Sequence, residues 1–156
     1  MISARKLLGT LLLAATAYAS GAPTDFTGKW SFDPTQSKNV GMMAQGKITT
    51  VIAQTKVGVI VDDTSVFVGP PATQHTVYDL TGKATPNESM MAGKATTHSH
   101  WDGMRLVTKW ESAGAIAGTV VERTETRYLS ADRKVMYVES VRAGKEPIVM
   151  VFVRSK

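Results

Sequence analysis

From about residue 25 to the C-terminus, apolar residues recur at every second position, in short runs bounded by Gly, Pro, Asn or Asp. A period of two is that of a β-strand, and no stretch keeps a helical apolar stripe for three turns. The pattern therefore predicts an all-β chain. The predicted strands are Gly28–Phe32, Lys47–Gln54, Gly58–Asp62, Ser65–Val68, His75–Asp79, Lys94–Trp101, Met104–Ser112, Thr119–Leu129, Lys134–Val141 and Pro147–Arg154.

Short connections join most of these roughly eight to ten strands, and short links force neighbouring strands to run antiparallel. Such a chain is a meander of sequential hairpins. Because closing the sheet removes its exposed edges, we predict an antiparallel up-and-down β-barrel, with a β-sandwich as the alternative. The last two predicted strands are apolar on both faces, which indicates that something covers them.

The first 19 residues have the composition of a secretory signal peptide. A basic start is followed by an apolar run from Leu7 to Ala17, which is shorter than the about 20 residues needed to span a bilayer. Cleavage after Ala19 would start the mature chain at Ser20, with Ala22 as the alternative start. We therefore expect an exported protein, periplasmic or extracellular, with no membrane span.

Residues 20–156 suit one domain with a core of its own. The chain has no cysteine, so we expect neither a disulfide framework nor a lipid anchor. Loss of Arg5 and Lys6 with the signal lowers Lys and Arg from 18 to 16 against 13 acidic residues, and the net charge from +5 to +3. A charge this mild does not indicate a nucleic-acid partner. The oligomeric state stays open.

Asp102-Gly103 lies between two alternating runs, which is typical of a hairpin with a type I′ turn. In that register Trp101 lies opposite Met104, and His100 lies opposite Arg105. One side of the hairpin is then the core side, with Ala95, Thr97, Ser99, Trp101, Leu106, Thr108 and Trp110. The other side, which carries both histidines, faces solvent.

Two segments do not fit the strand pattern. Asn39–Gly46 and Thr81–Gly93 are rich in small and turn-forming residues, and each contains a pair of methionines. We predict that both are long loops, the kind of segment in which function often resides. A tight turn is predicted at Ser130–Arg133, with Arg133 at a position where glycine is common.

The run Asp25-Phe26-Thr27-Gly28-Lys29-Trp30, followed by Asp33-Pro34-Thr35-Gln36-Ser37, resembles the opening of a family of small exported bacterial proteins of uncharacterised function. That family shows D-x-T-G-x-W and then D/N-P-x-x-S, and the resemblance continues through residues 78–83, 101–107 and 129–133. Gly28-x-Trp30 is also similar to the opening of lipocalins and related calycins, where the Trp closes one end of the barrel. The resemblance implies a lipocalin-like, calycin-like barrel with Trp30 as a plug.

Aromatic residues often line barrels that enclose one small molecule. We therefore take Trp101, Leu106 and Trp110 as candidate ligand-binding residues, although core packing explains them equally well. The methionine pairs in the two long loops are flexible apolar side chains that suit a barrel mouth. These further candidates are Met42, Met43, Met90 and Met91.

His98 and His100 are weak candidates for a metal site, because residues i and i+2 of a strand project from one face. Two ligands leave a site incomplete, and the expected neighbour Arg105 would disfavour a cation. A soft copper site would combine these histidines with the methionines. Copper proteins usually space their methionine ligands apart, whereas the methionines of each pair here are adjacent in sequence. We therefore predict no metal and no cofactor.

The sequence contains no nucleophile motif, metal-hydrolase motif or phosphate loop, so no catalytic residue is predicted. Asp62 and Asp63 are interpreted as the end of a strand and the start of a turn. Arg123, Glu125 and Arg127 alternate in sign along one face of a strand, which we interpret as a solvated face.

The first functional hypothesis is a non-catalytic exported protein that binds a small apolar ligand in its barrel. The alternative is an envelope-associated interaction module with a filled barrel, which would show an exposed apolar patch around Val149, Val151 and Val153. A metal-binding protein and an enzyme are the remaining alternatives.

Overall fold

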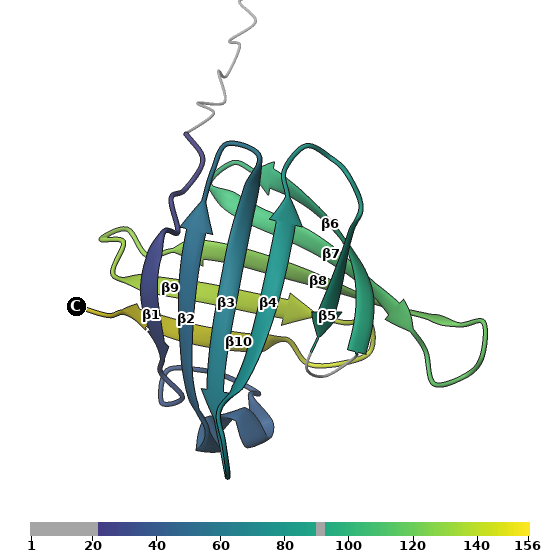
Figure 1. Ribbon diagram of the computed structural model, residues 1–156, viewed down its shortest axis with the longest axis horizontal. Coiled ribbons are helices and arrows are strands. Elements are labelled where there is room, and N and C mark those ends of the chain that lie inside the picture. The colour runs from purple at the N-terminus through teal and green to yellow at the C-terminus, as the bar shows by residue number, and fades with distance from the viewer. Residues whose placement is uncertain (1–21, 90–92) are drawn as a thin grey trace, which may run out of the picture.

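The computed structural model describes residues 22–89 and 93–156, and within these ranges the chain forms ten β-strands and one short 3-10 helix (Figure 1). The elements are β1 (Gly28–Phe32), η1 (Gly41–Gln45), β2 (Lys47–Gln54), β3 (Gly58–Val66), β4 (Ala72–Asp79), β5 (Thr85–Ser89), β6 (Gly93–Asp102), β7 (Arg105–Ala113), β8 (Val120–Leu129), β9 (Val135–Val141) and β10 (Ile148–Arg154). The predicted signal peptide lies outside the described residues. No helix in the described ranges is long and apolar enough to cross a membrane.

All ten strands belong to one antiparallel sheet in the order β4-β3-β2-β1-β10-β9-β8-β7-β6-β5. Strands that follow each other in sequence are paired in the sheet, except β4 and β5. The first and last strands pair with each other, with Trp30 opposite Arg154, and β4 and β5 form the two edges. The predicted up-and-down barrel is therefore confirmed, in a nearly closed form, and the β-sandwich alternative is wrong.

Side-chain hydrogen bonds bridge the seam between β4 and β5. The Asn87 side chain accepts a hydrogen bond from the Val77 backbone N–H at 2.9 Å and donates one to the Val77 carbonyl at 2.8 Å. It also donates to the Thr97 hydroxyl at 2.8 Å. One amide side chain thus supplies the donor and the acceptor that a backbone ladder would supply here.

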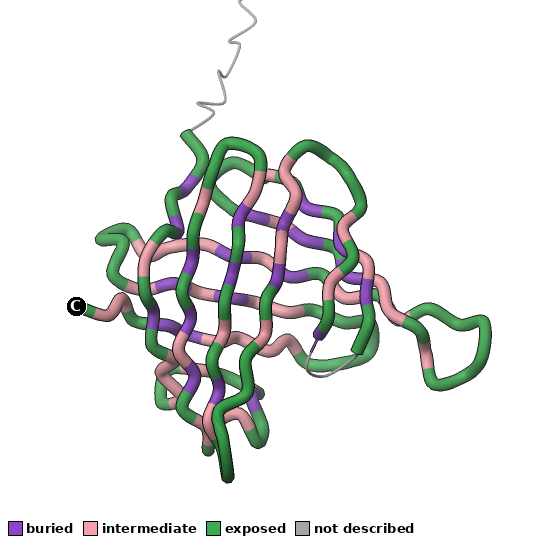
Figure 2. Tube along the Cα trace, viewed as in Figure 1, coloured by how far each residue is buried: buried purple, intermediate pink, exposed green. Residues whose placement is uncertain are grey.

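Buried and exposed residues alternate along most strands, as Figure 2 shows, because side chains point alternately into the barrel and out of it. One end of the barrel, which we call the closed end, is filled by aromatic packing. Trp30 is fully buried and donates from Nε1 to the Phe26 carbonyl at 2.9 Å. The Phe26 ring stacks on Trp101 at a centroid distance of 5.9 Å. The predicted role of Trp30 as a plug is confirmed.

The hairpin between β6 and β7 differs from its predicted register by two residues. Trp101 pairs with Leu106, and Asp102 pairs with Arg105, so the turn consists of Gly103 and Met104. Only Gly103 has a positive φ, of 59°. This pattern is that of a type II′ turn, which needs glycine only at its first central position. A register shift of two residues leaves each side chain on the same face of the sheet, so the predicted core side of the hairpin is correct.

Two segments predicted as a turn and a loop are strands in the structure. The segments predicted as separate strands at 58–62 and 65–68 are one strand, β3, and Asp62 and Asp63 lie within it and not at a turn. The predicted loop Thr81–Gly93 contains β5. The turn at Ser130–Arg133 is confirmed, since Arg133 has a φ of 58° and its N–H donates to the Ser130 carbonyl at 2.9 Å.

The outer face of β10 is covered in part, and the three valines predicted for a docking patch do not form a continuous exposed surface. Val151 is only 2% exposed and Val149 is half-buried, whereas Val153 is 37% exposed. The segment after β1 follows this strand, with backbone hydrogen bonds in both directions between Lys38 and Val149. The Val151 N–H also donates to the Ser37 hydroxyl at 2.9 Å. A loop of the same chain therefore lies along β10 beside Val149 and Val151, and it is one of the covers that the apolar pattern predicted.

Candidate ligand-binding cavity

The end of the barrel opposite Trp30, which we call the open end, contains a cavity in two parts. The inner chamber has a volume of about 250 Å³ and lies between the inner faces of the two halves of the sheet. Its apolar lining comes from β2, β9, β10, η1 and the β3–β4 turn. These residues are Met43, Ile48, Phe67, Val138, Ile148, Met150 and Phe152.

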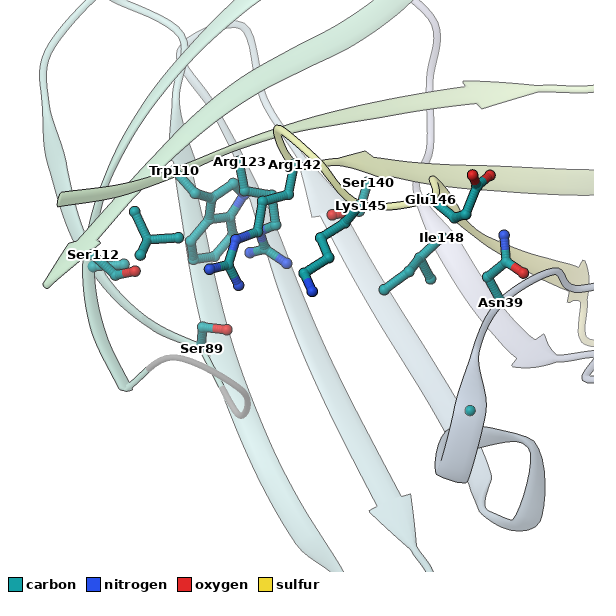
Figure 3. A pocket seen from close by; sticks show the side chains of 13 residues that line it. Asn39, Ser89, Trp110, Ser112, Arg123, Ser140, Arg142, Lys145, Glu146 and Ile148 are labelled. Carbon is teal, nitrogen blue, oxygen red and sulfur yellow. The ribbon is translucent and has the colours of Figure 1, made fainter. Parts of the chain in front are cut away.

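The outer chamber, of about 580 Å³, lies at the mouth between β5, β7, β8 and the β9–β10 loop (Figure 3). Five residues line both chambers, which indicates that the two connect: Ser89, Trp110, Arg123, Ser140 and Ile148. Together the chambers reach the size at which proteins enclose small molecules, about 300–1,000 Å³.

The polar part of the inner chamber is a buried cluster on β8 and β4. Arg127 lies 3.2 Å from the Glu125 carboxylate, and their side chains are only 6% and 10% exposed. The Tyr78 hydroxyl donates to the same carboxylate at 2.8 Å. The buried cation is thus neutralised by a neighbouring carboxylate on its own strand, which in turn is held by the tyrosine.

Burial dominates the ionisation of this cluster. It raises the pKa of the Tyr78 hydroxyl, and the adjacent Glu125 raises it further, so Tyr78 stays a neutral donor. Burial alone would lower the pKa of Arg127, but the nearby acidic groups Glu125 and Asp63 and the hydrogen bond to Tyr78 oppose it, and the pKa is raised. The guanidinium therefore remains charged.

Asp63 is a second carboxyl group that faces the inner chamber, from β3. It accepts a hydrogen bond from the buried Thr50 hydroxyl on β2. Burial raises its pKa above the ordinary value, against the opposing effects of the Thr50 hydrogen bond and Arg127. The buried part of the inner chamber therefore holds one cation, Arg127, and up to two carboxylates, whereas the half-buried Arg123 lines this chamber from the side of the mouth.

The prediction of a solvated face on β8 is wrong, because Glu125 and Arg127 are among the buried residues. The observed pairing of β7 with β8 explains this burial. Residues opposite each other in a sheet share a face, and Trp110 on the core side of β7 lies opposite Arg123. Residues at alternate positions after Arg123 must then point inward as well.

The mouth carries three cations from β8 and the β9–β10 loop. The half-buried Arg123 guanidinium lies 4.5 Å above the Trp110 ring. Arg142 and Lys145 are exposed and, in Figure 3, point into the same opening. Across residues 22–89 and 93–156, no carboxylate lies within 4.0 Å of these three cationic groups.

The structure brings two of the candidate ligand residues to the cavity. Trp110 lines both chambers, and Met43 lines the inner one. Trp101 lies at the closed end against Phe26, and Leu106 is buried in the core.

Met42 is 81% exposed and is not among the lining residues. Met90 and Met91 lie outside the described residues.

The two weak metal candidates lie on the outer face of β6. His98 pairs with Lys109 and His100 with Val107, so the expected pairing of His100 with Arg105 is wrong. His75 lies on β4 and pairs with Asp62 at 2.6 Å, also at the outside. In the described part of the chain, no group of three or more His, Asp or Glu residues is arranged to hold a metal.

Fold and cavity together define a calycin-like β-barrel with a partly polar interior. The chain is similar to an asparagine-to-alanine mutant of the fluorescent protein UnaG, with 16% identity over 84% of this chain and 96% of that chain and a TM-score of 0.63. It is similar to the REP1-NXSQ fatty acid transporter, with 14% identity over 83% and 96% and a TM-score of 0.64. It is also similar to human cRBP IV, with 17% identity over 85% and 100% and a TM-score of 0.62.

No family model matches the chain, and no curated protein matches it. At identities of 14% to 17%, the structural likeness shows the fold alone.

Proposed function

We propose that this protein is an exported carrier that binds a small, mainly apolar molecule in the open end of its barrel. The observation that carries the proposal is the pair of connected chambers, which leaves the inner faces of β8, β9 and β10 unfilled in a domain whose other end is tightly packed. Close packing is the rule in protein interiors, so a cavity of this size at one end is a functional feature.

Two further points support a carrier. One structural neighbour is a fatty acid transporter by name, and it has the same barrel over nearly its whole length. The apolar wall of β9 and β10 faces the chamber, so an apolar ligand would gain about 25 cal/mol for each Å² that it removes from water. The signal-like composition of residues 1–19 supports export.

The test is native mass spectrometry of the protein purified gently from its own host, compared with the mass after denaturation. We expect a reproducible extra mass of a small organic molecule that is lost on denaturation. The peptide mass should also correspond to a chain that begins near Ser20, recovered outside the cytoplasm. A chain that retains residues 1–19 would contradict export.

A matched pair of variants makes the mass measurement specific to the cavity. Ser140→Phe places a ring where the two chambers meet, whereas Ser31→Phe changes an exposed residue on β1. The extra mass should disappear only in Ser140→Phe. If both variants keep it, the molecule binds elsewhere and the carrier proposal fails.

A further inference from the structure

Among the cations that line the open end, those with no carboxylate of the described residues within 4.0 Å lie at its mouth. Arg123, Arg142 and Lys145 converge on the outer chamber from β8 and the β9–β10 loop, and the Glu146 carboxylate points away from them (Figure 3). Arg123 is held in place by its contact with the Trp110 ring, 4.5 Å away. One side of this group of cations is the entrance, and the other leads to the apolar inner chamber.

The interior of the barrel would stabilise a ligand anion much less than the mouth would. Its one buried cation, Arg127, already pairs with Glu125 at 3.2 Å, and Asp63 faces the same chamber. A ligand anion placed beside Arg127 would meet the Glu125 carboxylate and would lose its own hydration. An anionic group therefore gains more at the mouth, where no carboxylate of the described residues lies within 4.0 Å of the three cations.

We infer that the ligand is an anionic amphiphile that binds with its head group outward, on Arg123, Arg142 and Lys145, and its apolar part in the inner chamber. This inference rests on the proposed carrier function and names its ligand class. The apolar part would follow Ile148, which lines both chambers, toward Met150 and Phe152 on the same strand.

Three cations favour a head group with two negative charges over one with a single charge. Guanidinium groups bind phosphate oxygens through paired hydrogen bonds, and the mouth presents two of them beside one ammonium. The ligand class with the best match is therefore a phosphate monoester on an apolar chain. The corresponding carboxylate should bind less tightly, and the uncharged alcohol least tightly.

The test compares dodecyl phosphate, dodecanoate and dodecanol, each by displacement of the uncharged dye N-phenylnaphthylamine at about pH 8, where the phosphate carries two charges. Mouth variant Arg142→Gln/Lys145→Gln changes only exposed loop residues, so the fold should be retained. Control variant Lys29→Gln/Lys56→Gln removes the same charge from exposed sites away from the mouth.

We expect the mouth variant to bind dodecyl phosphate about tenfold more weakly, and to bind dodecanol as the wild type does. The control variant should lose much less affinity for the phosphate. Raising the salt from about 0.05 M to about 0.5 M should reduce the preference for phosphate over alcohol, because exposed charges are screened.

An interior variant distinguishes the two possible head-group positions. Glu125→Gln/Arg127→Met removes the buried charge pair and leaves Tyr78 an acceptor. We expect it to keep the phosphate preference. Loss of the preference in this variant, or its retention in the mouth variant, overturns the head-outward inference while the carrier function stands. If neither the dye nor any of the three compounds binds, the carrier function itself is wrong.

Discussion

The two ends of the barrel differ in how they use tryptophan. At the closed end, Trp30 is fully buried, its Nε1 donates to the Phe26 carbonyl, and the Arg154 guanidinium lies 4.1 Å from its ring. At the open end, Trp110 borders both chambers, and within the described residues its Nε1 has no hydrogen-bond partner. The first tryptophan completes a packed core, and the second forms one wall of a cavity.

The difference shows that stability and binding are assigned to opposite ends of one sheet. Packed aromatic contacts resist change, because any void that they leave lacks partner atoms. An end that must admit a ligand does without such contacts. Variants at the two ends should therefore differ in stability.

The largest expected effect is at the closed end. Trp30→Ala should lower the free energy of unfolding by about 4 kcal/mol, because it removes a buried ring and a satisfied hydrogen bond. Trp110→Ala should cost less, about 3 kcal/mol, since its ring already borders a cavity and its Nε1 has no hydrogen-bond partner among the described residues. Urea unfolding of both variants measures the difference. Equal losses would remove the contrast between the two ends.

The buried charge cluster is the next test. Arg127→Met leaves the buried Glu125 carboxylate without its cation and should cost about 3 kcal/mol. The double variant Glu125→Gln/Arg127→Met removes both charges, and most of that loss should be recovered. Urea unfolding at neutral pH gives both values. A double variant less stable than the single one would mean that the pair itself stabilises the barrel.

The seam between β4 and β5 should depend on one side chain. Asn87→Ala removes both hydrogen bonds to Val77 and should cost about 1–2 kcal/mol. Faster amide hydrogen exchange at Val77 would localise the effect. The matched exposed substitution Glu88→Ala, on the same strand, should leave that amide protected. Equal exchange in the two variants would show that the seam is closed by other contacts.

The smallest effect should depend on pH. Because burial raises the pKa of Asp63, the folded state binds this proton more tightly than the unfolded state does. The free energy of unfolding of the wild type therefore rises as the pH falls through the raised pKa of Asp63. The rise ends near the pKa of an ordinary aspartate, about 4. Asp63→Asn keeps an acceptor for Thr50 but cannot titrate.

The Asn variant should be more stable than the wild type at pH 7, and its advantage should vanish toward about pH 4. Unfolding curves of the two proteins across this range provide the measurement. An advantage that grows on acidification would mean that the carboxylate is stabilised in the folded state.

The sequence predicts the strands well where every second residue is apolar. β1 and β2 begin and end at the predicted residues, and the core side of the β6–β7 hairpin is correct. β5 was missed because Thr85-Pro86-Asn87-Glu88-Ser89 contains no apolar residue and includes a proline, which edge strands tolerate. Apolar periodicity cannot detect such a strand.

The candidate site was predicted less well for a related reason. Met43 and Trp110 reach the cavity, but the charged residues of β8 were assigned to solvent because charge usually means exposure. Their burial depends on partners from distant strands, Tyr78 on β4 and Asp63 on β3. Only the closure of the barrel brings these groups together.

The most direct test of a ligand-binding open end is a titration of methyl-labelled methionine with anilinonaphthalene sulfonate, observed by NMR. Met43 and Met150 line the inner chamber, whereas Met104 lies in the β6–β7 turn at the other end. We predict that the methyl signals of Met43 and Met150 shift in a saturable way while that of Met104 stays in place. Shifts confined to Met104, or none at any of the three, would contradict a ligand cavity at this end of the barrel.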